Sequence, residues 1–311
     1  MDQSPPSTPR ILAIGECMIE FSPAGEAEAY RRGFAGDTFN TAWYIRQVRP
    51  QALVSYLTAI GDDAVSDRFL AFLDETGIDR RFVRQVPGGT MGLYLIALKD
   101  GERSFSYWRD MSAARLLAEN SRRLDQAMAE ADTIYFSGIT LAILSDPART
   151  RLFRALERAR VQGRLVAFDP NLRPRLWEDA ATMRDRTMQA AALSDLVLPS
   201  FEDEATHFGD ADPQATIARY RAAGTLAVTV KNGPGAVHYL EGAAQGVVEI
   251  PAAAEVVDTT SAGDSFNAVY LACLGDEGMT IRDRILAAAA MARHCIGGRG
   301  ALVPLKDAAV L

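Results

Sequence analysis

The sequence predicts an α/β protein with a central, mostly parallel sheet flanked by helices, and a small second β-sheet that could act as a lid. Two observations support this fold class. From about residue 133 onward, short apolar runs alternate with longer amphipathic segments, as strands and helices do around a parallel sheet. Residues 91–109, in contrast, have the pattern of two strands joined by a tight turn.

The strands of the larger sheet are expected to be short buried runs separated by helices. They are residues 133–137, 164–168, 196–199 and 226–231, with helices over 148–161 and 180–193. Polar residues follow these strands directly: Asp169 and Asn171 after the second, 200–204 after the third and 232–235 after the fourth. Open α/β sheets bind their ligands at that edge, so we expect the site there.

The predicted lid combines the 91–109 hairpin, turning at residues 99–102, with segments 16–21 and 30–34 in a small antiparallel sheet. We therefore expect one α/β domain over residues 10–311, with lid strands inserted from about 16–34 and 91–109. Residues 1–9 are polar and proline-rich, which indicates a flexible tail.

Composition excludes several classes of partner. Asp and Glu (40) outnumber Lys and Arg (33), and the basic residues are scattered, so nucleic acid is not expected to bind. The alanine-rich stretch 285–292 is far shorter than the roughly 18 apolar residues of a membrane span. Three widely spaced cysteines indicate neither disulfides nor a zinc site, which favours a reducing cytoplasm. His207, His238 and His294 have no metal or triad spacing and are expected to be structural.

The most informative segment is 257–266, where small residues lead into an apolar helical pattern that runs to about Leu274. The first amides of a helix are unpaired and carry its positive dipole end, so the backbone from Ala262 to Asp264 could bind a phosphate. Asp264 would lie beside that anion and could accept a hydroxyl proton during phosphoryl transfer. The alternative is a helix that is merely well capped.

This segment resembles the Asp-Thr-x-Gly-Ala-Gly-Asp signature of the ribokinase-like, PfkB-type carbohydrate kinases. Between residues 11 and 304, further segments resemble motifs of this family and follow one another in the family's order. They are residues 15–16, 35–42, 61–63, 169–173 and 231–235. The resemblance implies a ribokinase-like fold, ATP and Mg²⁺ as cosubstrates, and phosphorylation of a terminal hydroxyl. Ser261 and Ala35 stand where many members have glycine, and Ser200 where many have asparagine.

The resemblance also implies a role for each matching residue. Asp264 would be the catalytic base, with the backbone of Ser261, Ala262 and Gly263 completing the anion hole. Sugar hydroxyls would meet Gly36, Asp37 and Asn40. The nucleotide-binding set would comprise Asn171, Ser200, Lys231, Asn232, Gly233, Gly235, Asp258 and Gly263. Glu204, in the acidic cluster 202–204, is a weak candidate for magnesium, because acidic residues at a helix start are often solvated instead.

Arg109 and Arg173 favour a sugar acid as substrate, because a guanidinium group binds a carboxylate through paired hydrogen bonds. Tyr94 and Tyr107 would add hydroxyl contacts and apolar walls. The segments around Arg109 and Arg173 look most like those of family members that phosphorylate 2-keto-3-deoxy sugar acids. Two alternatives remain open: a kinase for a neutral sugar such as fructose, ribose or tagatose, and a catalytically silent sugar- or nucleotide-binding module. The family's lids often pair between subunits, which implies a homodimer or larger homo-oligomer.

Overall fold

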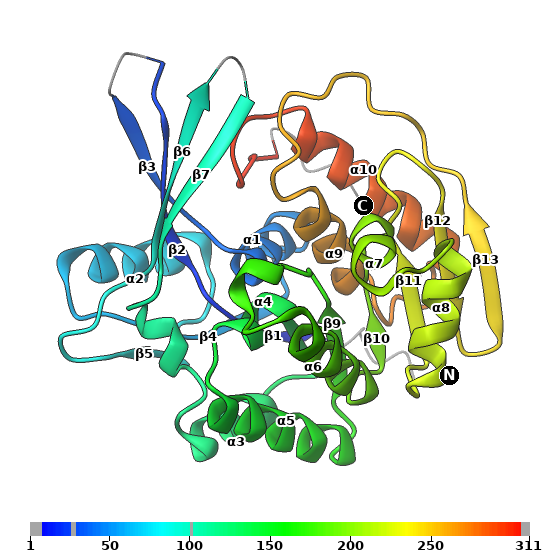
Figure 1. Ribbon diagram of the computed structural model, residues 1–311, viewed down its shortest axis with the longest axis horizontal. Helices are drawn as coiled ribbons and strands as arrows, with labels where there is room; N and C mark the ends of the chain where they lie inside the picture. The colour runs from blue at the N-terminus through cyan, green and yellow to red at the C-terminus, as the bar shows by residue number, and fades with distance from the viewer. Residues whose placement is uncertain (1–7, 26–28, 100–101, 306–311) are drawn as a thin grey trace.

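A computed structural model of the chain describes residues 8–25, 29–99 and 102–305. A nine-stranded sheet lies between two layers of helices, and a separate four-stranded sheet projects from one side of this larger body (Figure 1). This arrangement confirms the predicted fold class. The expected tail falls mostly on residues 1–7, which lie outside the described residues, as do residues 306–311.

The larger sheet is parallel from one edge through seven strands and ends in two antiparallel strands. Its order is β13 (Ala244–Val248), β12 (Val237–Glu241), β11 (Ala227–Val230), β10 (Leu196–Val197), β9 (Leu165–Asp169), β8 (Thr133–Ser137), β1 (Arg10–Ile14), β4 (Leu53–Ile60) and β5 (Val83–Gln85). The expectation that the parallel pattern begins near residue 133 was too narrow, because three strands precede it. The lid strands interrupt the strand–helix alternation there and obscure it in the sequence.

Both faces of the larger sheet are buried, and each supports its own hydrophobic core. Along β1, Leu12 and Ile14 face one core while Ile11 and Ala13 face the other, as the two-residue period of a strand requires. The first core is covered by α3 (Ser121–Ala129), α4 (Gly138–Ala142), α5 (Asp146–Val161), α6 (Ala180–Ala192), α7 (Phe201–Phe208) and α8 (Pro213–Ala222). The second is covered by α1 (Asp37–Val48), α2 (Ala64–Thr76), α9 (Ala262–Ala272) and α10 (Ile281–Ile296). Two short 3₁₀ helices span Ala113–Leu116 and Pro174–Leu176.

The smaller sheet consists of two hairpins side by side (Figure 1). Its order is β3 (Tyr30–Ala35), β2 (Met18–Pro23), β6 (Leu93–Lys99) and β7 (Glu102–Trp108). The prediction of an antiparallel sheet was wrong at its centre, where β2 and β6 pair in parallel. Each of these strands is the first of its hairpin and leaves the larger body, so the two run in the same direction. The predicted turn includes residues 100 and 101, which lie outside the described residues.

The lid sheet rests on the larger body through a small apolar cluster. Met18, Ala35, Tyr94 and Ile96 of the lid pack with Ala301, near the C-terminal end of the chain. Tyr44 on α1 donates a hydrogen bond to the carbonyl of Ala301 at 3.0 Å. The lid therefore contacts a segment that also packs against the core. Across the described ranges, no helix combines the length and apolar character that a membrane span needs.

Candidate active site

The predicted site residues converge at the carboxyl end of the parallel strands. Of the predicted residues, Asn171 follows β9 and Lys231 follows β11, and two residues that were not predicted as site residues stand with them: Glu16 after β1 and Asp169 at the end of β9. Helix α9 begins beside them, since Lys231 Nζ lies 3.6 Å from where a β-carbon on Gly263 would stand. This is the edge at which open α/β sheets bind ligands, so the structure brings the motif and the strand ends together as expected.

Helix α9 begins with a residue in the left-handed conformation. Ser261 has φ 61° and ψ 14°, which explains why a glycine is common at such a position. The amide of Ala262 donates to the carbonyl of Thr259 at 3.3 Å. The amides of Gly263 and Asp264 belong to the first helical turn and have no helical carbonyl within reach. The start of α9 can therefore bind an anion through its backbone.

Asp264 lies in that first turn and is held from the neighbouring helix. Asn40 on α1 donates through Nδ2 to Asp264 Oδ2 and to Ser261 Oγ, both at 2.8 Å. Burial, and next the nearby carboxylates of Asp37 and Asp169, raise the pKa of Asp264, while Asn40 and Lys231 lower it, and the net pKa is about 7. A carboxyl group with this pKa can accept a proton near neutral pH.

Gly36 and Asp37 begin helix α1 next to the strand end of β1. A β-carbon on Gly36 would lie 2.1 Å from the carbonyl oxygen of Glu16, so only glycine fits there. Asp37 is buried, and its Oδ2 accepts a hydrogen bond of 2.8 Å from Asn171 Nδ2. Burial also raises the pKa of Asp37. Asn171 adopts a left-handed φ of 35°, with its amide bonded to Asp169 Oδ1 at 3.1 Å.

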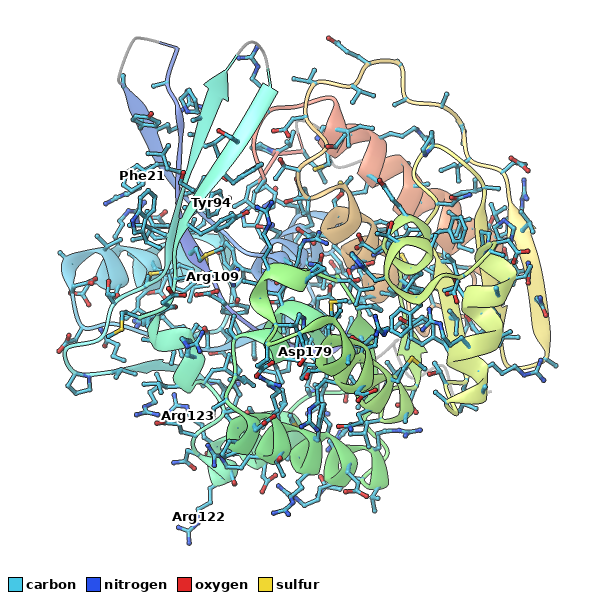
Figure 2. The ribbon with its side chains drawn as sticks, viewed as in Figure 1. Phe21, Tyr94, Arg109, Arg122, Arg123 and Asp179 are labelled. Atoms are coloured by element: carbon cyan, nitrogen blue, oxygen red, sulfur yellow. The ribbon has the colours of Figure 1, made fainter. Side chains whose placement is uncertain are left out.

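Arg109 reaches the same place from the lid. Its Nη2 donates to Glu16 Oε2, and their side chains are only 10% and 1% exposed. Glu16 Oε1 and Arg109 Nε are buried without a hydrogen-bond partner among the described residues. Figure 2 shows Tyr94 and Arg109 on the lid side, with Arg109 nearer the larger body. Arg109 thus retains donors for a ligand while Glu16 fixes its position.

The two tyrosines predicted at the sugar site are cross-strand partners in the lid. Tyr94 pairs with Tyr107, and their ring centroids are 5.8 Å apart. Tyr94 is buried and donates its hydroxyl hydrogen to Glu20, whereas Tyr107 is 52% exposed. They share one face, as the strand alternation predicted. Tyr107 therefore lies largely open to solvent on the lid.

Lys231 belongs to a buried polar cluster beside the start of α9. Its Nζ donates to Asp169 Oδ2 at 3.1 Å and to Asn267 Oδ1 at 3.0 Å. The sequence reasoning missed Asn267. Its position three residues after Asp264 was the available signal, because residues three apart share one face of a helix.

The remaining nucleotide-side residues lie on turns around this cluster. Ser200 pairs with Lys231 through a backbone bridge, and the Gly235 amide closes a turn on the Asn232 carbonyl at 2.8 Å, with Gly233 at φ 53°. Asp258 is buried, and its Oδ2 accepts a 2.7 Å bond from the Gly300 amide, which ties the motif to the loop after α10. These assignments remain predictions.

Arg173 is placed differently from Arg109. Its side chain is 49% exposed and donates to Asp203 Oδ2 at 3.2 Å. Burial raises the pKa of Asp203, Arg173 lowers it, and the Asp169 carboxylate adds to the rise. Arg173 therefore pairs with a carboxylate of the protein itself, and its assignment to the sugar carboxylate remains a prediction.

The weak assignment of Glu204 to magnesium does not fit its surroundings. Glu204 is fully buried, and its two carboxylate oxygens accept hydrogen bonds from Arg219 and Tyr220. Burial raises its pKa to about 7. A carboxylate enclosed by its own partners stabilises the packing of α7 against α8. Within the described part of the chain, no group of three or more His, Cys, Asp or Glu side chains is arranged to hold a metal ion.

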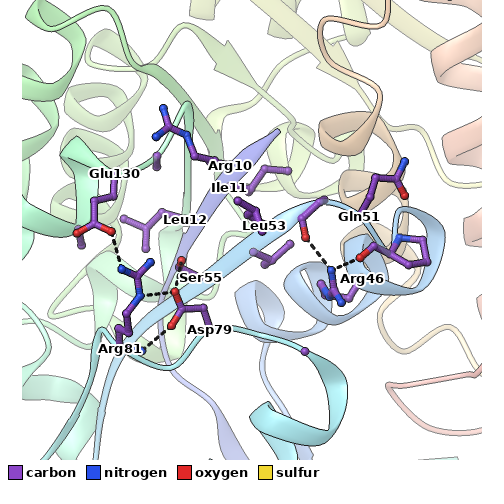
Figure 3. Close-up of a pocket in the computed structure, with 16 residues that line it drawn as sticks. Arg10, Ile11, Leu12, Arg46, Gln51, Leu53, Ser55, Asp79, Arg81 and Glu130 are labelled. Carbon is purple, nitrogen blue, oxygen red and sulfur yellow. Dashed lines mark hydrogen bonds and ion pairs between the residues drawn. The ribbon is translucent and has the colours of Figure 1, made fainter. Parts of the chain in front are cut away.

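A cavity of about 440 Å³ lies away from this site, at the amino-terminal ends of β1 and β4 (Figure 3). Its charged side chains bind groups of the protein itself. Arg81 pairs with Asp79 and Glu130, Arg10 pairs with Asp132, and Arg46 donates to main-chain carbonyls. The cavity lacks the convergence of catalytic groups found around Asp264.

Comparison with known proteins agrees with the geometry. A sequence profile described as pfkB family carbohydrate kinase matches residues 8–308. The chain is similar to proteins named 2-dehydro-3-deoxygluconokinase from Dickeya dadantii (strain 3937) and Escherichia coli (strain K12). It is 38% identical to each of them. The match with the Dickeya protein covers 96% of this chain and 98% of that protein. The match with the Escherichia coli protein covers 95% of this chain and 97% of that protein. A crystal structure of fructokinase with bound ATP from Xylella fastidiosa has the same fold, with a TM-score of 0.82 at 24% identity, covering 94% of this chain and 93% of that one.

Proposed function

The chain belongs to the pfkB family of carbohydrate kinases, and we propose that its substrate is 2-keto-3-deoxygluconate, also called 2-dehydro-3-deoxygluconate. ATP would phosphorylate the terminal hydroxyl of this sugar acid, giving 2-keto-3-deoxy-6-phosphogluconate and ADP. The names of the similar proteins support the choice of substrate. The observation that carries the chemistry is Asp264 in the first turn of α9, bound by Asn40.

Asp264 is the proposed catalytic base. It takes the proton from the terminal hydroxyl as that oxygen attacks the γ-phosphorus of ATP, and the bond to the ADP oxygen breaks. Asn40 orients the receiving carboxylate, and the amides of Gly263 and Asp264 stabilise negative charge on the transferred group. Closure of the lid would exclude water from the reaction.

The end of the sugar that carries the acid is proposed to meet Arg109. A continuous set of contacts links this residue to the base: Arg109 pairs with Glu16, and Glu16 abuts Gly36, whose amide donates to Asn40 Oδ1 at 3.2 Å. Asp37 and Asn40 supply oxygen acceptors for hydroxyl groups between the two ends. A neutral sugar would offer no carboxylate to the donors of Arg109 that Glu16 does not use, which favours the acid.

Magnesium is proposed to accompany ATP. Mg²⁺ prefers oxygen ligands and keeps several waters and phosphate oxygens in its shell, so it needs few protein ligands. Asn171 and Asp203 carry such oxygens near the strand edge, whereas both oxygens of Asp169 already accept hydrogen bonds from Asn171, Lys231 and Asn267. The residues present therefore fit the ion. Bound there, it would neutralise phosphate charge.

The proposed assembly is a homodimer or larger homo-oligomer formed through the lid. Phe105 and Tyr107 stack at 6.2 Å with an interplanar angle of 17°, yet are 40% and 52% exposed. Neighbouring exposed aromatic side chains favour contact with another protein surface. We also propose a cytoplasmic location, in keeping with three buried cysteines that form no disulfide. Gel filtration with light scattering tests the assembly.

A substrate panel tests the proposed function. ADP release is measured by a coupled assay with 2-keto-3-deoxygluconate, gluconate, fructose, ribose and tagatose, at one enzyme and ATP concentration. We expect the highest kcat/KM with the 2-keto-3-deoxy acid. A higher value for a neutral sugar would contradict the substrate, and absence of ADP formation with every compound would favour a silent binding module.

A further inference from the structure

Lys231 lies between two acceptors and the start of α9. Asp169 and Asn267 accept two of its three N–H donors, which leaves one without an acceptor among the described residues. Its Nζ stands 3.6 Å from the position of a β-carbon on Gly263. Only 12% of the side chain is exposed. The ammonium group therefore borders the space in front of the amides of Gly263 and Asp264.

Asn267 explains how this position is maintained. It is fully buried, lies on α9, and donates through Nδ2 to Asp169 Oδ2 at 2.6 Å and to the Tyr135 hydroxyl at 3.1 Å. Its Oδ1 accepts from Lys231. Burying a polar amide is costly unless its groups are hydrogen-bonded, and here the partners fix its orientation. Asn267 thus links the helix that carries Asp264 to the cation beside it.

We propose that Lys231 donates its remaining N–H to the phosphoryl group during transfer, and that Asn267 is the positioning residue that directs it there together with Asp169. This inference rests on the proposed phosphoryl transfer. Lys231 stays protonated throughout: the hydroxyl proton goes to Asp264, a bond forms from the sugar oxygen to phosphorus, and the bond to the ADP oxygen breaks. Lys231 supplies positive charge where negative charge develops.

This role differs from simple nucleotide binding. A cation that binds ATP equally in the ground state and the transition state changes KM for ATP and leaves kcat unchanged. A cation whose bond to the phosphoryl group strengthens in the transition state changes kcat. The ammonium group of Lys231 lies next to Gly263, at the start of α9, where the transferred phosphoryl group is proposed to bind. This position favours an effect on kcat.

The test compares Lys231→Met, Lys231→Arg and Asn267→Leu with the parent enzyme, using whichever sugar the parent phosphorylates. Thr229→Val is the matched control, because Thr229 is a buried polar residue on β11 whose hydroxyl bonds to Tyr270 on α9, outside the site. Steady-state kcat, both KM values, ATP affinity and melting temperature are measured. A parent enzyme that phosphorylates no sugar would refute the proposed function before this comparison begins.

We expect Lys231→Met to lower kcat by about 100-fold or more, with KM for the sugar within about twofold. Lys231→Arg should recover part of that loss, and Asn267→Leu should lower kcat by about tenfold while ATP affinity is retained. Thr229→Val should keep the parent kcat. A Lys231→Met enzyme with the parent kcat and a raised KM for ATP would overturn the proposal. If Asn267→Leu does not fold, the kcat of Lys231→Met is sufficient to test the proposal.

The pH profile gives a readout that a purely structural role would not change. The charged and titratable groups around Asp264 among the described residues are Asp37 and Tyr44 on α1, Tyr135 on β8, Asp169 on β9, Lys231 after β11 and Cys295 on α10. Lys231 is the cation among them and lowers the pKa of Asp264. Its replacement by Met should move the acid limb of the kcat/KM profile to higher pH, and an unmoved limb would contradict a close approach of Lys231 to Asp264.

Discussion

Asn40 Nδ2 donates a 2.8 Å hydrogen bond to Asp264 Oδ2, which joins the first turn of α1 to the first turn of α9. The same nitrogen lies 2.8 Å from Ser261 Oγ, and Asn40 Oδ1 accepts from the Gly36 amide. The amide group of Asn40 is therefore fixed at both ends. As a result, the carboxylate of Asp264 has one defined orientation at the start of the helix.

Activity should depend on the ionisation of Asp264. Its pKa is raised to about 7, and the base must be deprotonated to accept a proton, so activity is lost as pH falls through that value. We expect kcat/KM to fall about tenfold per pH unit on the acid side and to level off above neutrality. Asn40→Ala removes a hydrogen bond that lowers this pKa, so its limb should lie at higher pH. A profile flat down to pH 5 would contradict the assignment.

Replacement of the base separates binding from chemistry. Asp264→Asn keeps the side-chain size but cannot accept the hydroxyl proton, so kcat should fall by about 100- to 10,000-fold. ATP affinity, measured by calorimetry, should be retained or improved because a negative charge near the phosphates is removed. An unchanged kcat would refute the role of Asp264 as base.

Substrate discrimination should depend on Arg109. Arg109→Ala is expected to lower kcat/KM for the sugar acid by about 100-fold, corresponding to a lost charge-assisted contact, and to change kcat/KM for a neutral sugar little. Arg173→Ala is the matched comparison, since Arg173 pairs with Asp203 and is half exposed. If Arg173→Ala lowers kcat/KM for the sugar acid alone and Arg109→Ala does not, the acid end of the sugar binds at Arg173, and the proposed orientation is wrong.

The contact between Gly36 and Glu16 predicts intolerance to a single methyl group. In Gly36→Ala the new carbon would meet the Glu16 carbonyl at 2.1 Å, so the backbone must move. We expect a loss of stability of about 1–3 kcal/mol and a larger KM for the sugar. Gly278→Ala is the control, because nothing lies within 4 Å of its β-carbon position. Equal urea midpoints for the two variants would contradict this packing.

Glu204 should matter for stability and not for catalysis. Glu204→Gln weakens the buried pair with Arg219, and a loss of about 1–3 kcal/mol in the free energy of unfolding is expected, while kcat and its magnesium dependence stay unchanged. Glu202→Gln, on the exposed neighbouring residue, should alter stability by less than about 0.5 kcal/mol. A weaker magnesium response in Glu204→Gln would restore the metal assignment.

The sequence predicted the elements whose signal is local. Periodicity after residue 133 identified β8, β9 and β11, and the small residues before Asp264 indicated the start of α9. The parallel pairing of β2 with β6 escaped prediction because strand direction depends on where each hairpin leaves the body, which residue patterns do not record. The contacts of Asn267 and the burial of Glu204 were also not predicted, because their partners lie elsewhere in the sequence and meet them only in the folded protein.

The contact of the lid with Ala301 joins two parts of the proposed site to one short segment. Met18, Ala35, Tyr94 and Ile96 pack with Ala301, and the amide of the preceding residue, Gly300, donates to Asp258 ahead of helix α9. A shift of residues 300–301 would therefore move the support of the lid and the anchor of the α9 loop together. A substitution in this segment is expected to affect sugar binding and nucleotide binding at once.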